Sequence, residues 1–171
     1  MKTIGELIEE NNDILLRLDA LEKACVKLES GGKVAKAHLE QIIEFFSDFS
    51  SIYPHSKEED LIFKAMKKAG MISNDLVDGV VITTTIASML KERENARAFL
   101  RNMQKALAKY RSNEISAVDQ LITSAKAFIA LERKHIDREV NDLYPMAYSY
   151  LSRGELAGLY EQFEQVAGES G

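Results

Sequence analysis

The chain has 171 residues, of which 46% are hydrophobic and 29% charged, a composition typical of a single folded domain over residues 1–171. Its net charge of -5, with Lys and Arg interleaved among Glu and Asp, argues against binding to nucleic acid. No stretch approaches the roughly 18 consecutive apolar residues of a membrane-spanning helix, and the N-terminus lacks a signal-peptide core, so we expect a cytoplasmic protein without membrane contact.

The first predicted helix begins at a capping box, Thr3 to Glu6, and ends at the SGG of residues 30–32. A second helix is predicted over residues 34–68. Pro54 interrupts it, because proline removes a backbone donor and clashes with the preceding turn, so we expect a kink or a fresh helix start there. In both segments apolar residues recur at spacings of three and four, which is the period of a helix with one buried face.

The third and fourth helices are predicted over residues 79–110 and 113–150. Short connections between long helices favour antiparallel neighbours, so the sequence predicts an all-α, up-down-up-down four-helix bundle with its core over residues 4–150. A second capping box, Ser152 to Glu155, predicts a short fifth helix over residues 153–166. We expect this helix to pack on its own bundle, with a homodimer or protein-partner contact as the alternative.

Polar residues interrupt the apolar seam once on each of the four long helices. Burying a polar side chain without a partner costs about 1 to 3 kcal/mol, so four interruptions at similar depth indicate a site inside the bundle. His135 and Glu139 lie one turn apart and could bind one ion together. The interrupting residues are Asn11, Glu58 with its neighbours His55 and Glu59, Arg93, and the pair His135 and Glu139.

Four segments resemble, in their order and in their residue patterns, the hemerythrin-like domains with an HHE cation-binding pattern. The resemblance covers about residues 4–150 and implies a four-helix bundle that usually holds two non-haem irons, often for sensing oxygen, nitric oxide or iron. The segments are IEENNDILLRLDALE, PHSKEEDLIFKAMKKAG, IASMLKERENARAFLRNM and HIDREVNDLYPMA.

Several ligand positions that the resemblance implies carry other residues in this chain. Asn11 stands where the first helix of the family has a histidine, Pro54 replaces the first histidine of the second helix, and Arg93 replaces the histidine of the third. The fourth helix keeps both expected ligands, His135 and Glu139. From the second helix, His55 and the expected carboxylate ligand Glu58 remain.

These replacements support a metal-free bundle as the first hypothesis. Arg93 cannot lose its proton to coordinate a metal, and we expect it to form a salt bridge with Glu58 or Glu139 in place of the metal charge. The protein would then have no resident cofactor and act as a regulatory or interaction module. On this view His55 is partly exposed at the mouth of the bundle, and Glu59 and Asp60 belong to a solvated face or to the charge pattern of a helix start.

The alternative hypothesis is a non-haem metal-binding sensor or carrier with a remodelled site for a divalent ion such as iron. Its ligands would be His135, Glu139 and Glu58, with His55 and Glu59 brought inward by the helix start at Pro54. Catalysis by amino acids alone is not predicted, because the sequence has no Ser–His or Cys–His pattern and no Gly-rich phosphate loop.

Overall fold

The structure is a computed structural model that describes residues 2–51, 54–69, 78–111 and 116–169. Every regular element in these ranges is helical, so the all-α prediction is confirmed. The elements are α1 (Ile4–Glu29), α2 (Lys36–Ser51), α3 (Pro54–Lys68), α4 (Asp78–Arg111), α5 (Ser116–Arg138), the π-helix η1 (Glu139–Leu143), α6 (Tyr144–Tyr150) and α7 (Arg153–Glu169).

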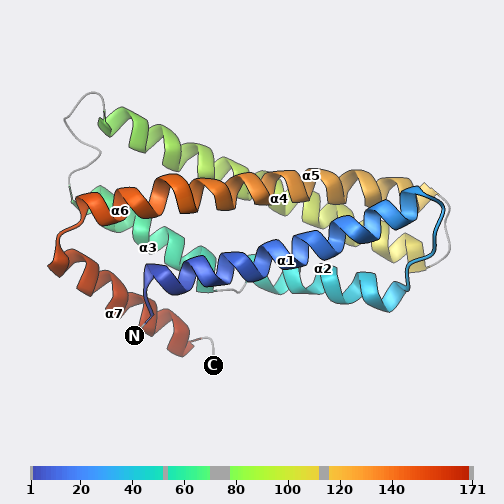
Figure 1. The fold of residues 1–171 in the computed structure, drawn as a ribbon, viewed down its shortest axis with the longest axis horizontal. Helices are drawn as coiled ribbons and strands as arrows, with labels where there is room; N and C mark the ends of the chain where they lie inside the picture. Colours follow the sequence, from blue (N-terminus) through green and yellow to red (C-terminus); the bar gives the residue numbers. More distant parts are fainter. Residues whose placement is uncertain (1, 52–53, 70–77, 112–115, 170–171) are drawn as a thin grey trace.

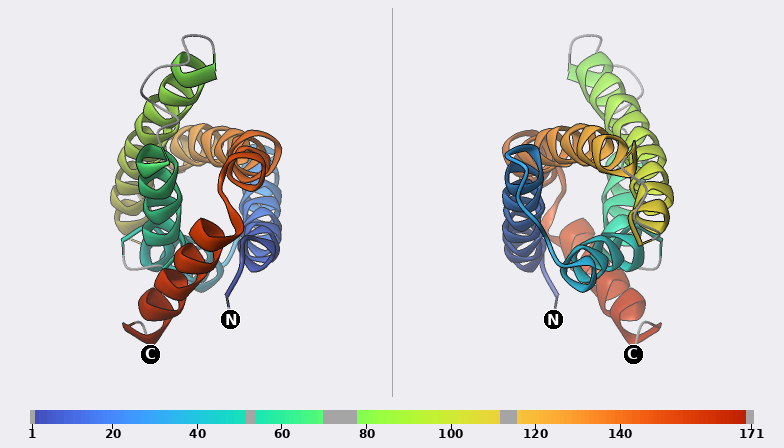
Figure 2. Two further views of the ribbon diagram at one scale, coloured as in Figure 1. Left: turned by 90° about the vertical axis from the view of Figure 1, so that its left-hand side faces the viewer. Right: turned by 90° about the vertical axis from the view of Figure 1, so that its right-hand side faces the viewer.

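The long helices form the antiparallel bundle that the sequence predicts (Figure 1). α1 runs in one direction, α2 and α3 return, α4 runs back again, and α5 with η1 and α6 completes the fourth leg. α4 packs along α5, which also packs against α1, while α2 packs against α4. Viewed along the bundle, these helices form a ring, and α7 crosses one end of it (Figure 2).

Local sequence signals explain where the helices start. The capping box at Thr3 is formed, with the Thr3 backbone N–H donating to Glu6 at 2.6 Å. A new helix, α3, begins at Pro54, which confirms the predicted start, although the side chain of Pro54 lies outside the described residues. The sequence predicts the fourth leg as one continuous α-helix, but in the structure the π-helix η1 divides it.

The fifth helix, α7, is also confirmed and extends to Glu169 rather than 166. Its capping box is formed, since Ser152 N–H donates to Glu155 and Glu155 N–H donates to the Ser152 hydroxyl. α7 packs against α3 of its own bundle, as expected. Within the ranges that the structure describes, none of the helices combines the length and apolar character needed to cross a membrane.

Two apolar clusters fill the bundle, and they meet at a polar layer. The larger cluster includes Ile14, Phe46 and Ala96, and the smaller one includes Leu7 and Met89. Along each helix a polar residue therefore marks the boundary: Asn11 follows Leu7 and precedes Ile14, and Arg93 lies between Met89 and Ala96. The polar layer thus lies inside the bundle, between two separately packed halves of the core.

Candidate metal centre

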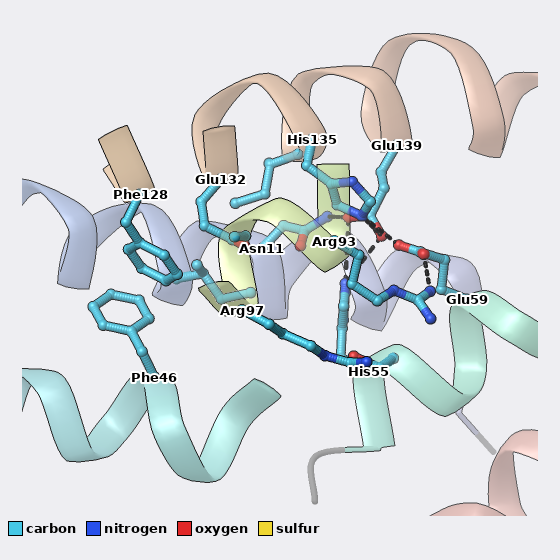
Figure 3. A pocket seen from close by; sticks show the side chains of 14 residues that line it. Asn11, Phe46, His55, Glu59, Arg93, Arg97, Phe128, Glu132, His135 and Glu139 are labelled. Atoms are coloured by element: carbon cyan, nitrogen blue, oxygen red, sulfur yellow. Dashed lines mark hydrogen bonds and ion pairs between the residues drawn. The ribbon is translucent and has the colours of Figure 1, made fainter. Parts of the chain in front are cut away.

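Polar and charged side chains from four legs of the bundle converge in this layer (Figure 3). Seven of these side chains are at most 9% exposed, although burial of such groups is costly unless they find partners. The prediction that Asn11, Glu58, His135 and Glu139 face the core is confirmed. Among the described residues, the buried polar side chains are Asn11, His55, Glu58, Glu59, Glu92, His135 and Glu139.

Two sequence-based expectations for α3 were wrong. His55 is 7% exposed rather than lying open at the bundle mouth, and Glu59 is 2% exposed rather than solvated. The reason is helical spacing: once α3 starts at Pro54, His55, Glu58, Glu59 and Ile62 follow one another at intervals that place them on one face. Ile62 is fully buried, so the whole stripe points inward. Asp60, outside the stripe, keeps a half-exposed side chain.

Glu59, His135 and Glu139 form what we call the central cluster. The Nε2 atom of His135 lies 2.6 Å from Glu59 Oε2 and 3.8 Å from Glu139 Oε1. One nitrogen or oxygen atom from each residue lies within 4.8 Å of the others, and all three residues are buried. Two carboxylates and an imidazole, close together and shielded from water, are a suitable donor set for a divalent transition-metal ion.

Glu10, His55 and Glu58 form a second cluster next to the first. His55 Nδ1 lies 3.2 Å from Glu10 Oε2, and its Nε2 lies 3.3 Å from both carboxylate oxygens of Glu139. His55 therefore connects the two clusters, with one ring nitrogen facing each. The Glu58 carboxylate belongs to this second cluster, whereas Glu59 is the α3 carboxylate that lies beside His135 and Glu139.

The second cluster contains a cation from the chain itself, the ammonium group of Lys2. Lys2 Nζ lies 2.6 Å from Glu10 Oε1 and 2.7 Å from Glu58 Oε1. Burial opposes the charge, yet the hydrogen bonds to Glu10 and Glu58 raise the pKa of Lys2. Burial raises the pKa of Glu58, whereas the Lys2 ammonium group acts to lower it. The sequence pattern gave no indication that Lys2 reaches this site.

Arg93 does not bind the carboxylates that the metal-free hypothesis assigned to it. Its Nη2 atom forms an ion pair with Glu59 Oε1, and its Nη1 atom donates to Asp60 Oδ1 at 2.9 Å. The Glu58 carboxylate is instead paired with Lys2, whose Nζ lies 2.7 Å from Glu58 Oε1. Because Arg93 takes Oε1 of Glu59, the other oxygen, Oε2, remains directed at His135.

The π-helix η1 allows one residue of α1 to reach two residues of the fourth leg. Asn11 Nδ2 donates to Glu139 Oε2 at 2.8 Å and approaches the Tyr144 hydroxyl at 3.4 Å. In an α-helix, residues five apart point in different directions. Here the Tyr144 backbone N–H bonds to the Glu139 carbonyl in a π-turn, so both side chains face Asn11. Tyr144 was not identified from the sequence.

Electrostatic coupling shapes the protonation of the central cluster. Burial acts to lower the pKa of His135, but Glu59 raises it, to about 9 overall. Burial raises the pKa of Glu139, whereas the nearby charge of His55 acts to lower it. Burial also acts to raise the pKa of Glu59, but hydrogen bonding with Glu139 and the charges of His135 and Arg93 lower it. The cluster therefore carries a proton on His135 at neutral pH when no metal displaces it.

His135 has a further carboxylate partner that the sequence reading missed. Glu92, on α4, places Oε2 3.6 Å from His135 Nδ1, the ring nitrogen that faces away from the central cluster. Lys134 and Arg138 lie 3.1 and 3.5 Å from Glu92 Oε1. A carboxylate behind a histidine ligand fixes the orientation of the ring and raises its basicity, as is common at metal sites.

A cavity of about 50 Å³ adjoins the central cluster (Figure 3). A cavity needs about 10 to 15 Å³ to hold a water molecule, so this one has room for a small ligand or a few waters. Its walls combine residues of the polar layer with apolar side chains, and the charged residues Arg97 and Glu132 also line it. The apolar residues of its walls are Ile14, Phe46, Ala96, Phe128 and Ile136.

The donor set fits one divalent cation at the central cluster. The ligand atoms of Glu59, His135 and Glu139 already lie within 4.8 Å of one another, and the ion pair with Arg93 holds the Glu59 carboxylate. The second cluster fits a cation as well, but the Lys2 ammonium group is already there. The structure therefore does not reproduce a pair of equivalent metal positions.

Comparison with known families agrees with this picture. Residues 2–147 match the model of the hemerythrin HHE cation-binding domain. This match confirms the resemblance seen in the four sequence segments and the hemerythrin-like bundle that it implied. No curated protein and no solved structure matches the chain.

Proposed function

We propose, because this chain belongs to the hemerythrin HHE cation-binding domain family, that its central cluster binds one divalent transition-metal ion and that the protein acts as a metal-dependent sensor or carrier. The observation that carries the proposal is the convergence of Glu59, His135 and Glu139, three buried residues with donor atoms within 4.8 Å of one another. Imidazole and carboxylate donors together suit Fe²⁺, Mn²⁺ or Zn²⁺.

The surrounding residues favour binding of an ion over a purely structural cluster. Arg93 occupies only one oxygen of Glu59, and it leaves the oxygen that faces His135 available as a ligand. His55 and Asn11 both contact the Glu139 carboxylate. Such outer contacts hold ligands in position before an ion binds, which lowers the cost of ordering them.

A metal-free regulatory or interaction module is the second candidate. The observation in its favour is that two basic residues of the chain each bind two carboxylates of the layer: Arg93 binds Glu59 and Asp60, and Lys2 binds Glu10 and Glu58. These contacts compensate much of the buried negative charge without any ion. In this case Arg93 would stabilise the bundle through partners other than those expected from the sequence.

The test is metal stoichiometry. The purified protein would be stripped with a chelator, loaded anaerobically with Fe²⁺, Mn²⁺ or Zn²⁺ in separate samples, freed of unbound ion and measured by elemental analysis. We expect about one ion per chain, lost in His135→Ala and kept in the control His38→Ala, because His38 is an exposed histidine on α2. Absence of binding for all three ions would overturn the proposal in favour of the metal-free module.

A further inference from the structure

We propose that the second cluster, Glu10, His55 and Glu58, is a cation position that Lys2 fills with its own ammonium group, and that removal of this group opens the position to a second divalent metal ion. The inference goes beyond the proposed function, because it concerns a different set of ligands and does not require an ion at the central cluster.

The geometry of Lys2 is that of a bound cation. Its Nζ atom contacts Glu10 Oε1 at 2.6 Å and Glu58 Oε1 at 2.7 Å, and its side chain is 14% exposed. An ammonium group is a compact point charge with three donors and no acceptor. It therefore bridges two carboxylates from α1 and α3 much as a metal ion would, although with half the charge of a divalent ion.

A second observation shows that the ammonium group does not satisfy the position completely. Glu58 is fully buried, and its Oε2 atom has no hydrogen-bond partner among the described residues. A buried carboxylate oxygen normally finds a donor or a metal, since an unpaired one costs free energy. Glu58 thus presents a free ligand atom next to the atom that Lys2 already occupies.

His55 completes the donor set. Its Nδ1 atom lies 3.2 Å from Glu10 Oε2 on the side of the second cluster, while Nε2 faces the Glu139 carboxylate. With Nδ1 as a ligand, Nε2–H would donate to Glu139, the arrangement that orients many histidine ligands. One nitrogen and two carboxylates, Glu10 and Glu58, would then surround the ion, and these donor atoms lie within 4.8 Å of one another.

The bundle itself need not rearrange to open the position. Lys2 precedes the first residue of α1, Ile4, so its side chain enters the layer from the segment before the helix. The backbone N–H of Lys2 donates to the Glu164 carboxylate of α7, which fastens this segment to the end of the bundle. Substitution at Lys2 removes the ammonium group and leaves Glu10, His55 and Glu58 on intact helices.

The experiment compares the full-length protein with Lys2→Ala and Lys2→Gln, loaded with Zn²⁺ or Mn²⁺ and measured by elemental analysis. We expect each variant to bind one more ion per chain than the unmodified protein. Adding Glu58→Gln to Lys2→Ala should abolish the extra ion. Lys23→Ala, which removes an exposed lysine of α1, is the matched control and should leave the stoichiometry unchanged.

An unchanged stoichiometry in both folded Lys2 variants, or two ions in the unmodified protein, would overturn the inference. So would an extra ion that persists in the Glu58→Gln double variant. Circular dichroism checks folding, and Lys2→Gln retains a polar donor in case Lys2→Ala does not fold.

His135→Ala separates this inference from the proposed function. If the unmodified protein binds no ion but Lys2→Ala binds one that survives His135→Ala, the second position exists and the proposed central site fails. If the unmodified protein and Lys2→Ala each bind one ion, the proposed central site exists and the second position fails.

Discussion

The imidazole of His135 lies between two carboxylates, with Nε2 2.6 Å from Glu59 Oε2 and Nδ1 3.6 Å from Glu92 Oε2. The three residues come from three different helices, α5, α3 and α4. The inner carboxylate belongs to the central cluster, and the outer one forms a longer ion pair with the ring nitrogen that faces away from that cluster. The two carboxylates therefore stabilise the charged form of the His135 ring from both sides.

Glu92→Gln should weaken metal binding without removing the site. Loss of an outer carboxylate behind a histidine ligand typically costs about 10-fold to 100-fold in metal affinity. We expect a shift of that size in competition titrations against a chromophoric chelator, with an unchanged number of ions per chain. Glu94→Gln is the control, because Glu94 lies on the same helix with a 72% exposed side chain. Equal affinities for the two variants would contradict an orienting role for Glu92.

Arg93→Ala distinguishes two roles for the guanidinium. If Arg93 positions Glu59, its removal frees the carboxylate and lowers metal affinity, by about 10-fold by analogy with other outer contacts. If Arg93 instead substitutes for a metal charge, its removal should raise the affinity, since a nearby cation repels the ion. We expect the decrease. Arg101→Ala, which removes an exposed arginine of α4, is the control variant whose metal affinity is measured in the same titration.

Asn11→Ala should destabilise the metal-free protein. Asn11 is fully buried, and its amide donates to Glu139 at 2.8 Å, so truncation removes a donor from a buried carboxylate. We expect a loss of about 1 to 3 kcal/mol in the free energy of unfolding, measured by urea denaturation. Asn12→Ala removes an exposed amide one residue later and should change stability little. A loss no larger than that of Asn12→Ala would rule out a structural role for the Asn11 amide.

The stability of the metal-free protein should fall as the pH rises above neutrality. Burial acts to lower the pKa of both histidines, but Glu139 and Glu10 raise that of His55 to about 10, and Glu59 raises that of His135 to about 9. Both values lie above the ordinary 6.5, so the charged rings stabilise the fold. This stabilisation is complete below about pH 6.5 and disappears as the pH passes through 9 and 10.

Urea denaturation at pH 7 and pH 10 measures this effect in the chelator-treated protein. A His55→Gln, His135→Gln double variant should show a smaller difference between the two pH values. Metal affinity should rise over the same pH range, because an ion must displace the histidine protons to bind. A metal-free protein that is more stable at pH 10 than at pH 7 would contradict the assignment of charged rings.

The arrangement of the helices could be predicted because it follows from local signals. Capping boxes at Thr3 and Ser152, the proline at Pro54 and the spacing of apolar residues define where helices start and which faces they bury. The polar interruptions at Asn11 and Arg93 also located the layer correctly. These features depend on residues close in sequence, which a single chain reveals.

The pairing within the polar layer could not be predicted, because it depends on the rotation of each helix. Glu58 and Glu59 are adjacent and both buried, yet one faces Lys2 and the other faces His135. Side chains one residue apart on a helix point about 100° apart, so two neighbours can face different partners. The same spacing explains why Glu92, directly before the interruption at Arg93, was overlooked. The π-turn after Glu139 is followed directly by Pro145, which cannot donate a helix hydrogen bond and was the available signal for a break in the fourth leg.

The most direct measurement is the anomalous scattering of crystals of the Zn²⁺-loaded protein. We predict a single strong peak in the polar layer, about 2.0 to 2.2 Å from His135 Nε2 and from carboxylate oxygens of Glu59 and Glu139, with Lys2 still bound to Glu10 and Glu58. A layer without a peak, or a peak that Glu59 and His135 do not contact, would contradict a metal site at the central cluster.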